Sequence, residues 1–558
     1  MGLAVQRVTP EPVPASARQV MVRMRDGVLL ATDVYEPGST PSPAVLVRLP
    51  YDKNSRYVFF ERVAERFTAR GYVLVVQDVR GKFRSQGATL GWTGEVDDGY
   101  DTIEWITRQP WSDGIVGMFG DSYYGFTQWS AVVAQHPALR AIVPRVTCTG
   151  NGPGIAAYDP GSGRPQPLWL EGADYLAHHW VDRDTYDFEP DLTKRPLIAA
   201  YEKAFAALGK RSTGFDLVVG GITLPPYNGP HPYDARPVPV LHCVGWFDNL
   251  GIAHMRDYAE LARRPGWAAV QYLIADAVDH ENYLLENAPA AHGTDHMTDD
   301  AALERMLDAY TGPALDFFDV FLRGIAGPES LPRVRFKVGH AQWRTSTAWP
   351  PPEAAETELW LAAADRAAGP VPGGRLAEHP PAEEQSASWR YDPDNLVPSA
   401  TPNTFMLLRD HPDERPTADR DDVLVFTGPA AVSGKPLDLA GPVQVLLHVE
   451  STAPTFDIFV RLLDLAPDGS MRLIVRGSRQ ADAPGPVEID LGHTGYRLRP
   501  GHRLALLIAG SDFPNHLPNS GSYEDPWRTT APKASLQTLR AWAAHPSRLR
   551  LTVLPQAG

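Results

Sequence analysis

The segment Ile115-Val116-Gly117-Met118-Phe119 runs directly into Gly120-Asp121-Ser122-Tyr123-Tyr124-Gly125, and this junction decides the predicted fold. Its first part predicts a buried strand, and its second part opens an amphipathic helix. A tight turn between a strand and a helix holds a serine hydroxyl clear of the backbone and aims the helix N-terminal amides at developing negative charge. The common pattern is Gly-x-Ser-x-Gly, whereas here the second glycine lies one position later. We interpret the junction as a nucleophile elbow around Ser122.

Strands alternate with helices on both sides of this junction. Short β-branched runs such as 44–49 and 72–77 are typical of strands buried on both faces of a parallel sheet. The pair Asp26-Gly27 separates two alternating segments and predicts a hairpin. Strands separated by helices predict a doubly wound α/β sheet. The expected strands are 21–25, 29–35, 44–49, 72–77, 115–119, 238–244 and 268–274, and the expected helices are 59–69, 96–109 and 300–322.

Two further regions have a different character. From about 151 to 237 proline and glycine are frequent, and the helical stretches 168–180 and 197–208 predict an inserted helical cap. Beyond Gly324, short alternating segments such as 334–338, 357–361, 443–449 and 503–508 predict an all-β sandwich or jelly roll, with 363–385 as a surface loop. The predicted domains are the first part of an α/β-hydrolase domain (1–148), the cap (149–237), the second part of the α/β-hydrolase domain (238–324) and the jelly roll (325–558).

Composition excludes several classes of protein. The 558 residues carry 52 basic and 67 acidic side chains, a net charge of −15, so neither nucleic acid nor an anionic membrane is an expected partner. No apolar run approaches the length of a membrane span, and residues 1–14 lack the features of a secretory signal. The two cysteines, Cys148 and Cys243, have no CxxC spacing, so we expect buried thiols rather than a metal or redox site. A cytoplasmic location is expected.

A serine nucleophile needs a histidine base and an acid that orients it, in the chain order serine, acid, histidine. Asp248 follows the strand 238–244, and His280 follows the strand 268–274. Both therefore lie just past the carboxyl ends of predicted strands, where open α/β sheets bind ligands. Alternatives remain nearby. They are Asp276 and Asp279 as the acid, and His254, His292 and His296 as the base.

Acyl transfer also requires donors for the tetrahedral oxyanion. One expected donor is the backbone N–H of Tyr123, directly after the nucleophile. The second is expected from the loop after the strand 44–49, which reads Pro50-Tyr51-Asp52-Lys53. The phenol of Tyr51 is a candidate, although a tyrosine in such a loop is often a packing residue.

The motifs of this chain together resemble those of the cocaine esterase/X-prolyl dipeptidyl peptidase family. The resemblance covers nearly the whole chain. It rests on Pro50-Tyr51-Asp52-Lys53, Gln77-Asp78-Val79-Arg80-Gly81, Trp111-Ser112-Asp113-Gly114, the Ser122 junction, Gly245-Trp246-Phe247-Asp248, Phe321-Leu322-Arg323-Gly324, Tyr391-Asp392-Pro393, Arg420-Asp421-Asp422-Val423-Leu424, Gly441-Pro442-Val443 and Pro500-Gly501-His502-Arg503-Leu504.

The resemblance implies Ser122 as nucleophile, His280 as base, Asp248 as its orienting acid, and Tyr51 with the Tyr123 amide as oxyanion hole. It also implies that the α/β-hydrolase domain, cap and jelly roll meet around one pocket. Two departures stand out. The family usually has Gly-Pro-Trp-Ser/Thr-His at the base, whereas this chain reads Asp276-Ala277-Val278-Asp279-His280. The branch that acts on α-amino acid esters has acidic residues where this chain has Leu250 and Gly251, so that branch is disfavoured.

The sequence therefore predicts a serine hydrolase that needs no cofactor and no metal and cleaves a small-molecule ester or amide through an acyl-enzyme. Esters with hydrophobic or aromatic acyl groups are the first expectation. An X-Pro dipeptidyl peptidase, an amidase and an acyltransferase on the same triad are alternatives, and a non-catalytic carbohydrate-binding protein is a remote one. The sequence leaves a homo-oligomer open. Candidate substrate-binding residues are Trp169, Leu250, Phe405 and Met406.

Overall fold

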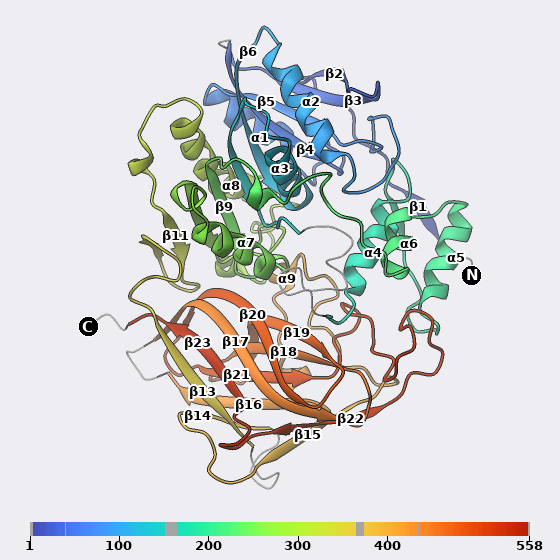
Figure 1. Ribbon diagram of the computed structural model, residues 1–558, viewed down its shortest axis with the longest axis vertical. Coiled ribbons are helices and arrows are strands. Elements are labelled where there is room, and N and C mark those ends of the chain that lie inside the picture. The colour runs from blue at the N-terminus through green and yellow to red at the C-terminus, as the bar shows by residue number, and fades with distance from the viewer. Residues whose placement is uncertain (1–3, 39–40, 151–164, 364–372, 432–435, 556–558) are drawn as a thin grey trace.

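The computed structural model describes residues 4–38, 41–150, 165–363, 373–431 and 436–555. An α/β domain, a group of helices beside it and a C-terminal all-β domain make up the molecule, and Figure 1 shows the all-β domain packed under the other two. The predicted fold class is confirmed. Residues 151–164 of the predicted cap and 364–372 of the predicted loop lie outside the described residues.

The α/β domain is built on a ten-stranded sheet with the order β12-β11-β10-β9-β7-β6-β4-β5-β3-β2. The strands from β11 to β5 in this order run parallel, while β2, β3 and β12 pair antiparallel with their neighbours. In chain order the strands are β2 (Arg18–Arg23), β3 (Leu29–Tyr35), β4 (Ser42–Leu49), β5 (Val73–Asp78), β6 (Ser112–Asp121), β7 (Leu139–Arg145), β9 (Val240–Gly245), β10 (Gln271–Asp276), β11 (Val334–Lys337) and β12 (Trp343–Ser346).

Helices cover both faces of this sheet because its central strands are apolar on both sides. Along β4, Leu46 packs into the cluster that contains Trp129, and Val45 packs into the cluster that contains Phe318. The first face carries α2 and α3, and the second carries α1 and α8. The helices of this domain are α1 (Phe60–Ala69), α2 (Glu95–Thr107), α3 (Ser122–Ala134), α7 (Gly251–Arg263) and α8 (Asp300–Phe321).

The helical group between β7 and β9 is fixed to the α/β domain by a buried lysine. The Nζ atom of Lys82 donates to the carbonyl oxygens of His179, Asp182 and Asp184 at 2.5, 3.1 and 3.2 Å. Because His179 ends α4, this contact holds that helix beside the sheet. The elements are α4 (Leu170–His179), β8 (Tyr186–Phe188), α5 (Ile198–Leu208) and α6 (Thr213–Val219), and β8 pairs with β1 (Val5–Arg7).

The C-terminal domain is an eleven-stranded, almost wholly antiparallel sheet. Long strands with alternating burial bend around one apolar core. Its strands are β13 (Ala355–Ala363), β14 (Gly373–Ala377), β15 (Ser386–Tyr391), β16 (Leu424–Ala430), β17 (Leu437–Ser451), β18 (Phe456–Leu465), β19 (Met471–Ala481), β20 (Gly485–Leu498), β21 (Arg503–Ala509), β22 (Ser535–Arg540) and β23 (Arg548–Val553). Two short helices, α9 (Leu407–Asp410) and α10 (Arg415–Ala418), lie between β15 and β16.

Two sequence expectations differ from the structure here. The segment 334–338 was expected in the all-β domain, but β11 pairs parallel with β10 and extends the α/β sheet. The region 363–385 was expected to be a surface loop, but β14 lies within it and pairs with β13 and β16. Short alternating segments fit either sheet equally well, so their sequence pattern cannot assign them. Cys148 and Cys243 are both buried and unpaired, as expected.

Candidate active site

The junction between β6 and α3 forms a strained turn at Ser122. Ser122 has a φ of +50°, which few residues other than glycine adopt. A Cβ atom on Gly120 would lie 2.0 Å from the Tyr124 ring, and one on Gly125 would lie 2.5 Å from Thr147 Cγ2. Gly125 therefore lets α3 pack against the chain that leaves β7. This contact explains why the second glycine of the motif lies one position later than in the common pattern.

His280 and Asp248 meet at the carboxyl ends of neighbouring strands. The Nδ1 atom of His280 lies 2.7 Å from Asp248 Oδ1, which also accepts the Leu250 N–H at 3.1 Å. Both side chains are buried. An aspartate at Nδ1 fixes the imidazole tautomer that leaves Nε2 free to take a proton.

The alternative acids and bases differ from Asp248 and His280 in their hydrogen-bond partners, packing or exposure. Asp279 accepts backbone N–H groups, and Asp276 accepts the N–H of Ala277. His254 is buried against His242, with 3.1 Å between their ring nitrogens. His296 packs on Tyr283, and His292 is exposed.

Tyr51 is oriented by a tyrosine from the cap. The hydroxyl of Tyr175 in α4 donates to the Tyr51 hydroxyl at 3.2 Å, and Tyr51 is also within hydrogen-bonding reach of Ser122. Burial raises the pKa of Tyr51 to about 12, so its phenol keeps its proton at neutral pH. Because Tyr51 accepts from Tyr175, its own proton is available toward Ser122.

The side chain of Tyr123 points away from the Ser122 turn into the core, so only its backbone amide can face that turn. Its hydroxyl donates to Glu95 Oε1 at 2.9 Å and accepts the Trp92 N–H at 2.9 Å. Its amide belongs to the first turn of α3, where N–H groups have no partner within the helix. The amide of Tyr123 thus belongs to the Ser122 turn itself, whereas the phenol of Tyr51 comes from the loop after β4.

A buried polar network joins the loop of Ser122 to the loop of His280. Asp121 accepts from Arg145 Nε at 2.9 Å, from Tyr310 Oη at 3.0 Å and from Asn282 Nδ2 at 3.2 Å. Arg145 also donates to Asn282 Oδ1 at 3.0 Å. Since Asp121 precedes Ser122 and Asn282 lies two positions after His280, the network fixes the relative position of the two loops.

The electrostatic surroundings of His280 are acidic. Burial by itself lowers the pKa of His280, but the charge and hydrogen bond of Asp248, together with the charges of Glu281 and Asp121, outweigh it and raise the pKa to about 9. Glu281 accepts a hydrogen bond from Tyr57 Oη at 2.7 Å. These charges favour the protonated, imidazolium form of His280.

Aromatic side chains form one wall beside His280. The ring of Phe405 lies 4.9 Å from the His280 ring, and the ring of Trp169 lies 5.8 Å from Phe405. Leu250 is buried in the loop after Asp248 and lines a pocket with Trp169. Met406, the fourth predicted substrate-binding residue, packs instead against the core of the all-β domain and contacts Arg409.

Sequence reasoning missed Tyr175 and Glu281 as residues of this site. Tyr175 comes from the cap, and no local pattern links a cap helix to the loop of Tyr51. Glu281 directly follows His280, so its proximity was visible, but its hydrogen bond to Tyr57 depends on the fold. Within the described ranges, no group of three or more metal-binding side chains comes together. In the same part of the chain, no helix has the length and apolar character needed to cross a membrane.

Comparisons with known proteins show the family of the chain. Residues 26–282 match the family model of the X-Pro dipeptidyl-peptidase (S15 family), and residues 326–550 match that of the X-Pro dipeptidyl-peptidase C-terminal non-catalytic domain. The chain is 30% identical over 547 residues to a cocaine esterase from Rhodococcus sp. (strain MB1 Bresler), covering 91% of this chain and 92% of that protein.

Solved structures show the same fold over nearly the full length. An aminopeptidase from the marine sediment archaeon Thaumarchaeota archaeon superposes with a TM-score of 0.77 at 22% identity, covering 98% of this chain and 99% of the other. An α-amino acid ester hydrolase superposes with a TM-score of 0.72 at 23% identity, covering 98% of each chain. The chain belongs to the cocaine esterase/X-prolyl dipeptidyl peptidase (CocE/NonD) family of serine hydrolases.

Proposed function

We propose that the chain hydrolyses carboxylic esters with Ser122 as nucleophile, His280 as general base and Asp248 as the acid that orients it. The observation that carries this proposal is the 2.7 Å hydrogen bond between His280 Nδ1 and Asp248 Oδ1. The hydrogen bond from Asn282 to Asp121 joins the loop of His280 to the left-handed turn at Ser122. The 30% identity to a cocaine esterase over most of the chain supports ester cleavage.

In the acylation half of the reaction, Ser122 Oγ attacks the ester carbonyl while His280 Nε2 takes its proton. The carbonyl oxygen becomes an oxyanion, which the Tyr51 phenol and the Tyr123 amide stabilise. The tetrahedral intermediate then collapses, the bond to the alcohol oxygen breaks, and the imidazolium returns the proton to the departing alcohol. An acyl-enzyme on Ser122 remains.

Deacylation repeats these steps with water as the nucleophile. His280 takes a proton from water, the hydroxide attacks the acyl carbonyl, and Ser122 leaves with the proton that His280 held. The carboxylic acid product is released. An amine or alcohol in place of water gives acyl transfer by the same chemistry, which keeps an acyltransferase as an alternative.

The wall of Phe405, Trp169 and Leu250 supports a preference for hydrophobic or aromatic acyl groups next to the carbonyl. Amidase and X-Pro dipeptidyl peptidase activities remain alternatives on the same triad. A panel of p-nitrophenyl esters, anilides and Xaa-Pro substrates separates them by kcat/KM. Esters are expected to be the best substrates, and a higher kcat/KM on Xaa-Pro substrates would replace the ester proposal.

The triad assignment is tested by Ser122→Ala and His280→Ala. Each is expected to abolish turnover, because triad residues act as one unit. Ser122→Ala is also expected to abolish labelling by a fluorophosphonate with an unchanged Tm, because the Ser122 hydroxyl contributes little packing. His292→Ala is the matched control, since His292 is exposed. Near-wild-type kcat in either triad variant refutes the assignment.

The buried, unpaired thiols of Cys148 and Cys243 support our expectation of a reducing, cytoplasmic environment.

A further inference from the structure

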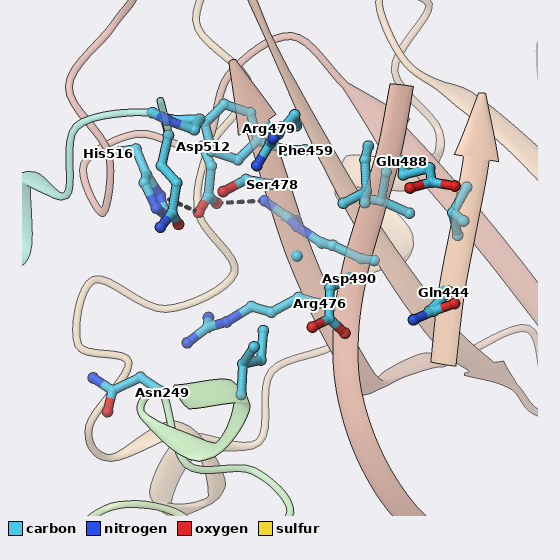
Figure 2. A pocket seen from close by; sticks show the side chains of 18 of the residues that line it. Asn249, Gln444, Phe459, Arg476, Ser478, Arg479, Glu488, Asp490, Asp512 and His516 are labelled. Atoms are coloured by element: carbon cyan, nitrogen blue, oxygen red, sulfur yellow. Dashed lines mark hydrogen bonds and ion pairs between the residues drawn. The ribbon is translucent and has the colours of Figure 1, made fainter. Parts of the chain in front are cut away.

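The pocket lined by Leu250 and Trp169 is a cavity of about 340 Å³ that opens between the three parts of the molecule. The start of α7 with Asn249 and Leu250, the segment before α4 with Trp169, and strands β17 to β20 of the all-β domain enclose it. Figure 2 shows polar side chains pointing into it from the β strands and Asn249 from the opposite side. The triad residues do not line this cavity, so it is distinct from the reacting centre.

The cavity is rich in positive charge, although the protein as a whole is acidic. Its arginines are Arg256, Arg461, Arg476, Arg479, Arg548 and Arg550, and its carboxylates are Glu488, Asp490 and Asp512. Several of the arginines are held by carboxylates. Arg256 pairs with Asp490 at 2.8 Å, Arg461 with Asp512 at 2.6 Å, and Arg548 and Arg550 with Glu358 at 3.0 and 3.2 Å.

Arg476 on β19 differs from those paired arginines. Among the residues that the structure describes, none accepts a hydrogen bond from its guanidinium or forms an ion pair with it. Figure 2 shows its side chain reaching toward the side of the cavity where Asn249, Asp512 and His516 lie. A guanidinium offers a planar fork of N–H donors that suits a carboxylate.

The carboxylates that feel the charge of Arg476 are already satisfied by other donors. Asp512 accepts from Arg461 through Oδ1 and from His516 through Oδ2, at 2.6 and 3.0 Å. Glu171 accepts the N–H and the hydroxyl of Thr404, at 2.6 and 2.5 Å. The donors of Arg476 therefore remain available for a ligand.

The cavity adjoins the proposed active site through apolar side chains. Leu250 lies two positions after Asp248 and lines the cavity. Trp169, on the same lining, contacts Phe405, which in turn packs on His280. Leu250 and Trp169 therefore connect the lining of the positive cavity with the surroundings of Asp248 and His280.

We propose that this cavity binds a carboxylate carried by the substrate through an apolar linker, with Arg476 as its partner. This inference rests on the proposed ester hydrolysis and adds a substrate class, esters that bear a free carboxylate. The carboxylate can belong to the acyl side, as in a half-ester of a dicarboxylic acid, or to the alcohol side. In the free enzyme the Arg476 guanidinium faces the cavity, and in the complex the substrate carboxylate neutralises its charge.

The test compares matched anionic and neutral esters. Mono-p-nitrophenyl glutarate, adipate and suberate are compared with p-nitrophenyl esters of monocarboxylic acids of the same length, and acetate esters of carboxyphenols with acetate esters of plain phenols. If wild type prefers the anionic half-esters over their neutral counterparts, the carboxylate belongs to the acyl side of the substrate. If it prefers the acetates of carboxyphenols, the carboxylate belongs to the alcohol side. Arg476→Gln is expected to lower kcat/KM for the preferred anionic ester by about 10- to 100-fold, while the neutral partner stays within about threefold.

Further variants exclude an effect on folding alone. Arg476→Glu is expected to disfavour anionic esters further and to gain activity on ammonium-bearing esters, which a merely structural role does not predict. Arg550→Gln is the matched control, because Arg550 lines the same cavity but pairs with Glu358. It is expected to leave the ratio of anionic to neutral kcat/KM unchanged. Equal losses on both ester types in Arg476→Gln overturn the proposal.

A binding measurement separates this inference from the proposed function. Glutarate, adipate and suberate are titrated calorimetrically into Ser122→Ala and into Ser122→Ala/Arg476→Gln. Saturable binding of any of them that the second substitution weakens at least tenfold supports the cavity, even if wild type hydrolyses no ester. Equal binding to both proteins, or no binding of any of the three, refutes it whatever the esterase activity.

Discussion

Asp279 Oδ2 accepts the backbone N–H of Leu408 at 2.8 Å, so the residue directly before His280 is tied to α9 of the all-β domain. Its other oxygen accepts the N–H groups of Glu281 and Tyr283 at 3.1 and 2.9 Å. Figure 1 shows α9 at the boundary between the α/β and all-β domains. The acidic segment that departs from the family pattern therefore has a structural role, because it holds the histidine loop from both sides.

The first prediction concerns Asp279→Ala. The substitution leaves three backbone N–H groups without their acceptor, so we expect a loss of unfolding free energy of about 3 kcal/mol or more. Because the loop carries His280, kcat/KM should fall more than about tenfold through misplacement of the imidazole. Urea unfolding and ester hydrolysis measure both effects.

The matched control is Asp276→Ala, since among the described residues the Asp276 carboxylate accepts a hydrogen bond only from the N–H of its neighbour Ala277, at 2.7 Å, and lies outside this loop anchor. It should lose much less stability. If Asp279→Ala were as stable and active as wild type, the anchoring role of this carboxylate would be wrong.

The second prediction concerns Tyr51→Phe. If the hydroxyl donates to the oxyanion, its removal weakens a bond that strengthens as charge develops, so kcat should fall about 10²- to 10³-fold, or ~3–4 kcal/mol, while KM changes little. Steady-state kinetics and the Tm measure the effect. An unchanged kcat would mean that Tyr51 is not the second donor to the oxyanion and that a backbone amide of the same loop takes this role.

Tyr175→Phe serves as its comparator. Tyr175 donates to Tyr51 but is expected to make no contact with the oxyanion, so its loss removes orientation and not the donor itself. The decrease in kcat should be smaller than that of Tyr51→Phe. A larger decrease in kcat for Tyr175→Phe would contradict the proposal that Tyr51 donates to the oxyanion and Tyr175 only orients it.

The sequence predicted the central strands and the elbow because each depends on a local pattern. The β-branched run of β4 and the glycines around Ser122 respond to burial and turn geometry within a few residues. Asp248 and His280 were chosen by chain order and by their place after strands, and the structure brings their side chains together. Their catalytic roles stay predictions.

What the sequence could not predict depends on partners far away in the chain. The strand β14 lies in a region rich in proline and glycine and gains its partner from β16, about fifty residues later. Tyr175 meets Tyr51 across 124 positions. The charge balance around Arg476 is likewise a property of assembled strands, since nothing next to it in sequence shows which arginines find carboxylates.

The third prediction concerns the pH dependence of ester hydrolysis. Only neutral His280 can accept the proton of Ser122, and its pKa is raised to about 9. The value of kcat/KM should therefore rise with pH through the neutral range, reach half of its maximum near pH 9 and level off above that pH. A pH profile with a stable ester tests this. A plateau that already begins below pH 6 would contradict the raised pKa.

The fourth prediction uses the charge of Glu281. Since this carboxylate raises the pKa of His280, Glu281→Gln should lower that pKa and move the acidic limb of the profile to lower pH. Glu286→Gln is the control, because Glu286 pairs with Lys337 at 2.6 Å and is not among the groups that raise the His280 pKa. If the acidic limb lies at the same pH in Glu281→Gln and Glu286→Gln, Glu281 does not act on the pKa of His280.

The last prediction concerns Gly125→Ala. The added Cβ would lie 2.5 Å from Thr147 Cγ2 and 2.7 Å from Thr147 Cβ, so α3 or Thr147 must shift. Thr147 Oγ1 donates to the Ser122 carbonyl at 2.6 Å, and a shift therefore reaches the nucleophile. We expect a loss of about 1–3 kcal/mol in stability, as for overpacking in a core, together with a lower kcat. Adding Thr147→Ser removes Cγ2 but keeps the hydroxyl, so the double variant should recover part of both losses. Two outcomes would contradict this explanation of the glycine at position 125. They are a Gly125→Ala variant with wild-type stability and kcat, and a double variant that recovers neither stability nor kcat.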